Sequence, residues 1–265
     1  MDLGLRGKSA LVTASSHGLG AACAEALARE GARVAICSRH RDEIEETANR
    51  IRKATGVEVL TFVADLSKPS DVLHMVEETV RTWGGLHVLV TNTGGPPPGR
   101  FDDLDDEKWR FGFTNTVEPV ISLIRGVLPA MRGQRWGRII TLTSSSVKEP
   151  IDALTLSNSL RPAIHGLVKS LSREVAAEGI TVNAIITGMF LTDRLRELAE
   201  NRAERNGTSA DQELEKMASA IPRGKLGDPM ELAEVVAFLA SQQARAVTGT
   251  AVVIDGGQTL GTTFG

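Results

Sequence analysis

Short apolar runs alternate with amphipathic stretches along this whole chain. The first three runs, Ser9–Thr13, Ala32–Cys37 and Val57–Val63, do not switch between apolar and polar residues at every second position. A strand that is apolar on both faces is typical of a parallel sheet covered by helices on both sides. The alternation therefore predicts right-handed β–α–β units in one doubly wound α/β domain of about seven strands.

Glycines and prolines mark where the intervening helices begin and end. Gly31 and Gly56 each follow an amphipathic stretch, as glycines at the C-terminus of a helix do. Pro69 lies at the position of a proline in the first turn of a helix. The helices expected from these signals are 18–30, 41–55, 69–83 and 155 to about 177, and the remaining strands are 86–91, 138–143, 181–186 and 251–254. No linker divides the chain, so a single domain is expected over residues 1–265.

One segment interrupts the alternation. From residue 189 to about residue 225 the chain is charged and helical in pattern. Connections of this length in a compact domain are often lids over a ligand site. We predict a substrate lid at 189–225, and the alternative is an exposed helical pair without a ligand role.

Composition limits the classes of partner. The 265 residues are 42% hydrophobic and 24% charged with a net charge of −3, so no basic footprint for nucleic acid is present. Cys23 and Cys37 are too few for a disulfide framework and lack metal-ligand spacing, which predicts free thiols and no metal site. No signal peptide and no stretch near the ~20 apolar residues of a membrane span is found, so a cytoplasmic protein without membrane contact is expected.

The run from Thr13 to Gly20 (TASSHGLG) joins the first strand to the first helix. Gly18 and Gly20 let the backbone approach a pyrophosphate, and the helix N-terminus supplies N–H groups and a positive dipole end to that anion. A tight turn without a ligand is the alternative. The position of the loop, at the start of the first β–α–β unit, favours a dinucleotide site in a Rossmann-type fold.

This loop resembles the T-G-x-x-x-G-x-G pattern of the short-chain dehydrogenase/reductase family, with Ala14 in place of the first glycine. The resemblance continues through ADLS after the third strand, TNTGG after the fourth, NAIITG after the sixth, and VTGTAVVIDGG near the end. It implies a cofactor site made of Ala14, Ser15, His17, Gly18, Leu19, Gly20, Ser38, Arg39, Asp65, Leu66, Asn92, Gly94, Arg161, Gly188 and Thr192.

The overall pattern is most similar to the 3-oxoacyl-acyl-carrier-protein reductase branch of the family. Family members are mostly tetramers, so the resemblance implies a homotetramer built on two helix faces, 115–131 and 156–177.

The end of the second strand bears on the choice of cofactor. An acidic residue there binds the ribose 2′-hydroxyl of NAD and repels a 2′-phosphate. This chain has Ser38 and Arg39 instead, with Arg41 nearby. A hydroxyl followed by a guanidinium suits a 2′-phosphate, which favours NADP(H) over NAD(H). The alternative for Arg39 is a solvated loop arginine.

The chain contains no tyrosine, although a tyrosine is the general acid of the family. In the family a serine, a tyrosine and a lysine act together, with an asparagine nearby. Ser144 matches the serine and Asn115 the asparagine, while Ser157 takes the tyrosine position and Arg161 the lysine position four residues later. A serine hydroxyl is a poor proton donor near neutral pH, and an arginine holds its proton. We therefore expect Ser144 and Ser157 to orient a substrate oxygen and Arg161 to polarise the site.

A substitute proton donor is sought in the loop after the fifth strand. Lys148, in SSSVKEP, lies four residues past Ser144, and a lysine desolvated beside Arg161 would release its proton more readily. The alternative is a surface lysine. His165, four residues after Arg161, is interpreted as a packing residue.

Two functions remain open from the sequence. The first is an NADP(H)-dependent oxidoreductase acting on a small-molecule carbonyl or alcohol, with an atypical proton donor. The second is an NADP(H)-binding sensor or scaffold without redox chemistry. The retained Ser144, Asn115 and glycine loop favour the enzyme.

Overall fold

The computed structural model describes residues 2–261, and in that part of the chain seven parallel strands form one sheet in the order β3-β2-β1-β4-β5-β6-β7. The strands are β1 (Ser9–Val12), β2 (Arg33–Ser38), β3 (Val59–Val63), β4 (Val88–Thr91), β5 (Gly137–Leu142), β6 (Ile180–Thr187) and β7 (Ala251–Ile254). The predicted doubly wound, Rossmann-type domain is confirmed, and every predicted strand is present within two residues of its expected ends.

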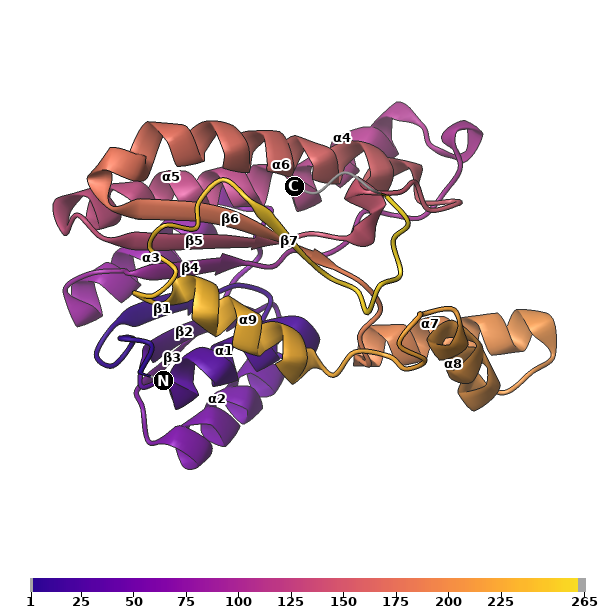
Figure 1. Cartoon of the computed structure of the whole chain (residues 1–265), viewed down its shortest axis with the longest axis horizontal. Coiled ribbons are helices and arrows are strands. Elements are labelled where there is room, and N and C mark those ends of the chain that lie inside the picture. Colours follow the sequence, from indigo (N-terminus) through magenta and orange to yellow (C-terminus); the bar gives the residue numbers. More distant parts are fainter. Residues whose placement is uncertain (1, 262–265) are drawn as a thin grey trace.

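Helices cover both faces of the sheet (Figure 1). One face carries α1 (Gly18–Arg29), α2 (Arg41–Thr55) and α9 (Pro229–Ala240), and the other carries α3 (Pro69–Trp83), α4 (Asp106–Thr116), α5 (Glu118–Gly133) and α6 (Thr155–Val175). Adjacent residues of β1 point to opposite faces of the sheet. Val12 packs in the core under α1 and α9, and Leu11 packs in the core under α3 and α5. This double burial explains the continuous apolar runs, because each fully buried aliphatic side chain stabilises the fold by ~2 kcal/mol.

The direction of strand order reverses between β1 and β4, which are hydrogen-bonded neighbours in the sheet. The chain leaves these two strands in opposite directions, so a crevice opens at their carboxyl ends. Thr13 and Asn92 join the two loops there: the Thr13 hydroxyl donates to the Asn92 carbonyl oxygen at 2.7 Å and accepts from the Asn92 amide at 2.9 Å. The Asn92 side chain donates to the Ala14 carbonyl oxygen at 3.1 Å.

The charged segment after β6 forms two helices, α7 (Asp193–Asn206) and α8 (Ala210–Ser219), which stand away from the sheet (Figure 1). Thr192 and Ser209 cap their N-termini with side-chain hydrogen bonds. The two connections to the body lie beside each other, because Phe190 pairs with Gly227 in an isolated parallel bridge. A Cβ on Gly227 would lie 2.4 Å from the Phe190 ring, so the bridge requires glycine there.

Two further features bear on the expectations from composition. Within residues 2–261 no helix is both long and apolar enough to cross a membrane, and no group of three or more His, Cys, Asp or Glu residues could hold a metal ion. Cys23 and Cys37 are free and buried, and burial raises the pKa of each thiol to about 12.

Candidate functional site at the carboxyl edge of the sheet

The turn between β1 and α1 is a close backbone cradle. A Cβ on Gly20 would lie 2.3 Å from the Ala14 carbonyl oxygen and 2.9 Å from the Ser15 Cα, so only glycine fits there. Ala14, which replaces the first glycine of the family pattern, is held at a φ of +46°, in the left-handed region. His17 is the N-cap residue of α1 but makes no capping hydrogen bond with its side chain. The first amides of α1, from Gly18 to Gly20, are thus available to an anion.

Not every predicted residue of this loop faces the crevice. Ser15 is fully buried, and its hydroxyl donates to the Val12 carbonyl oxygen at 2.7 Å and accepts from the Cys37 amide at 3.1 Å. Its amide donates to the Cys37 carbonyl oxygen at 2.9 Å. Ser15 therefore joins the loop to β2, and its hydroxyl is already used within the fold. Leu19 is half-buried at the start of α1.

A cleft of about 460 Å³ extends from the glycine loop along the ends of β2, β3 and β4. Its lining includes these residues singled out from the sequence: Ala14, His17, Ser38, Arg39, Asp65, Leu66, Gly94 and Asn115. The fold thus brings together side chains from five separate segments of the sequence. Its volume and extended form suit the adenine and the adjoining ribose of a dinucleotide.

The charges in the cleft are mixed. The Asp65 carboxylate accepts from the Ser67 hydroxyl at 2.8 Å and from its amide at 3.0 Å; these bonds lower its pKa, and the charge of Arg39 contributes further. Glu43, which the sequence reasoning missed, lies 3.5 Å from the Ser38 hydroxyl and 3.7 Å from the His17 Nδ1. Ser38 and Arg39 therefore share the end of β2 with one carboxylate from α2.

The chain after β6 borders the cleft beside the glycine loop. The Thr192 methyl group lies 3.3 Å from the position of a Cβ on Gly18, so the start of α7 rests against the start of α1. Gly188 packs against the backbone of Asp255, where a Cβ would come within 2.6 Å of the Asp255 Cα. Thr192 therefore lies beside the glycine loop, and Gly188 lies against the end of β7.

Asn115 reaches the cleft from α4. Its side-chain amide donates to the carbonyl oxygen of Phe111 at 2.9 Å, so its side-chain oxygen and its second N–H remain for other hydrogen bonds. Phe111 also lines the cleft, although no sequence signal distinguished it from the other aromatic residues of this helix.

The hydroxyls of Ser144 and Ser157 lie on either side of Ser146. Ser144 follows β5 by two residues and accepts from the Ser146 amide at 3.2 Å, which leaves its own proton available for donation. The Ser157 side chain, on α6, is 3.0 Å from the Ser146 hydroxyl and is 7% exposed. The residue at the tyrosine position is thus nearly buried and bonded within the protein.

Arg161 lies one helical turn after Ser157. Its Nε is buried and has no hydrogen-bond partner among the described residues. Burial, together with the charge of Arg194 from α7, lowers the pKa of the Arg161 guanidinium to about 10. At neutral pH it is still a cation, so it can place positive charge and hydrogen-bond donors beside a ligand.

The charge of Lys148 acts on His165 next to this cluster. Burial and the charge of Lys148 lower the pKa of His165, which keeps the imidazole neutral near pH 7. The Thr143 hydroxyl donates to the Ile185 carbonyl oxygen at 2.8 Å, so at 2.9 Å it accepts from the His165 Nε2. Lys148 itself is half-buried, in the turn after β5.

The loop of three prolines, residues 96–98, is attached to the start of α6. The Gly99 amide donates to the Ala153 carbonyl oxygen at 2.7 Å, and the Thr155 amide donates to the Gly99 carbonyl oxygen at 3.2 Å. These two bonds therefore hold the loop after β4 against the start of the helix that carries Ser157 and Arg161.

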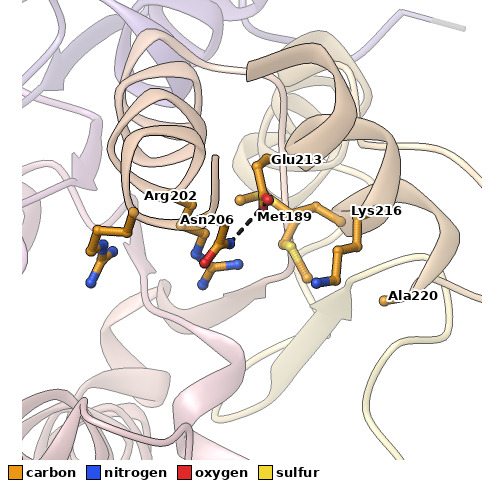
Figure 2. A pocket seen from close by; sticks show the side chains of 8 residues that line it. Met189, Arg202, Asn206, Glu213, Lys216 and Ala220 are labelled. Carbon is orange, nitrogen blue, oxygen red and sulfur yellow. Dashed lines mark hydrogen bonds between the residues drawn. The ribbon is translucent and has the colours of Figure 1, made fainter. Parts of the chain in front are cut away.

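A second cavity, of about 480 Å³, lies between the helices of the 189–225 segment (Figure 2). Met189 and Met217 give it apolar surface, and Arg202, Arg205 and Lys216 bring three cations to it. Its one carboxylate, Glu213, is 4% exposed and accepts from the side chains of Asn206 at 3.0 Å and Thr208 at 2.8 Å. The cavity is thus part of the packing of α7 on α8 and carries a net positive lining.

A doubly wound sheet with a glycine loop, free helix amides and a cleft at its carboxyl edge is typical of a dinucleotide-binding domain of the Rossmann type. The chain belongs to the short-chain dehydrogenase/reductase family, since residues 13–259 match the family model described as enoyl-(acyl carrier protein) reductase.

Characterised relatives cover almost the whole chain. Oxidoreductase UcpA of Escherichia coli K12 is 35% identical over 97% of this chain and 96% of that protein. The 3-oxoacyl-[acyl-carrier-protein] reductase FabG of Staphylococcus epidermidis RP62A is 34% identical over 94% of this chain and 98% of that protein. The crystal structure of L-sorbose reductase from Gluconobacter frateurii, complexed with NADPH and L-sorbose, has a TM-score of 0.95 at 33% identity, covering 98% of this chain and 99% of that chain. The predicted family is confirmed.

Proposed function

We propose that this oxidoreductase uses NADP(H) to interconvert a small-molecule carbonyl and its alcohol, and that its proton donor is not the residue at the tyrosine position. When bound, the nicotinamide ring supplies or accepts the hydride. The glycine loop supports this proposal most directly: a Cβ on Gly20 would lie 2.3 Å from the Ala14 carbonyl oxygen, so the tight turn requires glycine, and it leaves the first amides of α1 without a side-chain cap and free to bind a diphosphate.

The adenosine end of the cleft supports NADP(H) over NAD(H). Ser38 and Arg39 can donate hydrogen bonds to a 2′-phosphate, whereas Glu43 opposes its charge. The L-sorbose reductase of similar structure was solved with NADPH. Isothermal titration should give tighter binding of NADPH than of NADH.

Arg39→Glu tests the source of this preference. It should weaken NADPH binding at least tenfold while changing NADH binding only a few-fold. Lys53→Glu, on the exposed far end of α2, makes the same charge change away from the cleft and should leave both affinities unaltered. Equal affinity of the unaltered protein for the two cofactors would remove the preference.

The side chains around the substrate oxygen would act as orienting and polarising groups. The Ser144 hydroxyl has its proton free to donate, and the Arg161 guanidinium adds positive charge. Both would stabilise negative charge on the oxygen that receives a proton. The loss of a general acid typically lowers a rate 10²- to 10⁴-fold, so another donor is needed for rapid turnover.

Lys148 is the donor that we propose. It follows the short helical turn after Ser144, is half-buried, and its charge acts on His165 at the inner side of α6. In assays of NADPH oxidation with ketones, aldehydes and 3-oxoacyl thioesters, Lys148→Met should abolish the turnover. Ser157→Ala should leave most of it. The reverse order of effects would assign the proton transfer to Ser157.

We further propose that α7 and α8 form a substrate lid and that the protein is a homotetramer. The lid is supported by Thr192, the residue before α7, whose methyl group lies against Gly18 of the glycine loop. The tetramer rests on resemblance alone, through the faces 115–131 and 156–177. Light scattering after size-exclusion chromatography gives the mass of the assembly, and a 28.3 kDa particle would be a monomer.

One observation favours a second candidate, a cofactor-binding protein without turnover. The Ser157 hydroxyl is directed to Ser146 inside the protein, so nothing at the tyrosine position reaches a substrate. Binding of NADPH without oxidation across the same substrate panel would support this sensor or scaffold.

A further inference from the structure

Arg194 lies across the cofactor cleft from the lid side. It is the second residue of α7, and its guanidinium nitrogen Nη2 is 2.9 Å from the position of a Cβ on Gly95. Gly95 belongs to the loop after β4, on the opposite wall of the cleft. Two residues earlier, Thr192 rests against Gly18 at the glycine loop. The side chain therefore spans the opening between the glycine loop and the loop after β4.

No acidic side chain of residues 2–261 lies within ion-pair distance of Arg194 or Arg161. In the described part of the chain, neither guanidinium has a nitrogen within 4.0 Å of a carboxylate oxygen, the longest separation counted as a salt bridge. The two cations oppose each other, since the charge of Arg194 helps to lower the pKa of Arg161. Arg161 also carries a buried, unpartnered Nε. Arg194 is exposed at the cleft, and an anion bound beside it would reduce the repulsion between the two guanidiniums.

We propose that Arg194 binds the diphosphate of the dinucleotide and acts as a clasp between the lid and the body. This inference rests on the proposed function, because it takes the cleft to be the cofactor site. The clasp lies opposite the free amides at the start of α1, so the two would hold the diphosphate from both sides. It is carried by α7, so binding of the cofactor would draw the lid toward the loop after β4.

The position of Arg194 distinguishes the diphosphate from the other phosphate of NADP(H). A 2′-phosphate would lie at Ser38 and Arg39, at the end of β2, whereas Thr192 places the start of α7 at the glycine loop. A ligand with only the 2′-phosphate should therefore be insensitive to Arg194. A ligand with the diphosphate should depend on it.

Isothermal titration of purified full-length protein tests the clasp. The ligands are NADPH and adenosine 2′-monophosphate, and the variants are Arg194→Gln and Arg194→Lys. Arg196→Gln, exposed two residues further on α7 and outside the cleft, is the matched control. Circular dichroism spectra and melting curves show whether each variant is folded.

Arg194→Gln should weaken NADPH binding 10- to 100-fold, the loss expected for a charge-assisted pair, and Arg194→Lys should fall between it and the unaltered protein. Adenosine 2′-monophosphate should bind all variants equally, and the affinity for NADPH should depend less on salt in Arg194→Gln. Arg196→Gln should behave as the unaltered protein does.

Unchanged NADPH affinity in folded Arg194→Gln would refute the clasp, and so would an equal loss of affinity for adenosine 2′-monophosphate. If the unaltered protein bound neither NADPH nor NADH, the proposed function itself would fail. That result differs from a failure of the clasp, in which the unaltered protein and the variant bind NADPH alike.

Discussion

The substitution Gly20→Ala should separate the demands of the cofactor loop from the ordinary preferences of a helix. A Cβ at this position would lie 2.3 Å from the Ala14 carbonyl oxygen, 2.9 Å from the Ser15 Cα and 3.0 Å from the Ala14 carbonyl carbon. Ordinary van der Waals contact begins near 3.4 Å, so the backbone of the loop must move by about 1 Å. The obstructing atoms belong to the main chain, which cannot rotate away as a side chain can. The added Cβ should therefore lower the free energy of unfolding by ~3 kcal/mol.

Helix propensity acts in the opposite direction and reduces this cost. Alanine is favoured over glycine in a helix by ~1 kcal/mol, which leaves a net destabilisation of ~2 kcal/mol. In a domain of this size each kcal/mol changes the melting temperature by about 2–4 °C, so Gly20→Ala should melt about 4–8 °C lower. Because the displaced loop carries the amides of α1, NADPH affinity should fall at least tenfold.

Gly166→Ala is the matched control. Gly166 lies in the middle of α6, and a Cβ added there would meet no heavy atom within 4 Å. The same substitution should here raise the melting temperature by about 2–4 °C, through ~1 kcal/mol of helix propensity. Differential scanning fluorimetry and NADPH titration measure both variants. Gly20→Ala protein that melts no lower than the unaltered protein and binds NADPH normally would refute the reasoning from the cradle.

Three further outcomes are expected. Ala14→Gly should raise the melting temperature by about 1 °C or more, because alanine at a φ of +46° costs ~1–2 kcal/mol and the greater flexibility of glycine offsets only part of this; a lower melting temperature would contradict it. Burial and the charge of Lys8 lower the pKa of His87 to about 4 from 6.5, so protons bind the unfolded chain preferentially between these values. Stability should therefore fall as the pH drops from 6.5 to 4, and His87→Gln should flatten that dependence in melts over this range. Trp136→Leu should cost ~2 kcal/mol in urea denaturation, because the ring lies 4.5 Å from the Lys8 ammonium and 4.3 Å from the Arg138 guanidinium; a loss below ~0.5 kcal/mol would show that both contacts are weak.

The sheet was predictable because its signal is local. The run at Ser9–Val12 is buried at all four positions, as expected for a strand in the interior of a parallel sheet, whereas Val59–Val63, at the edge of the sheet, is only partly buried. Helix α9 (Pro229–Ala240) was missed, although Asp228 and Glu231 form a capping box at its start. Its residues are apolar nearly all round, since they pack on α1, so they show little amphipathic period.

The cofactor site was predicted in outline because glycines and strand ends are local features of a sequence. Gly20, Arg39 and Asp65 lie where their positions after β1, β2 and β3 place them. Glu43 and Arg194 were missed because each reaches the cleft from a helix whose angle to the sheet no local pattern encodes. The contact between the Ser157 and Ser146 hydroxyls could not be predicted either, because these residues are eleven positions apart and their contact depends on how the turn after β5 folds.

The paired connections at Phe190 and Gly227 have an evolutionary consequence. Since both ends of the α7–α8 hairpin leave the body at one point, its length and sequence can change without altering the register of any strand. The hairpin beyond Arg194 can therefore vary over generations, while the strands and the glycine loop keep their positions.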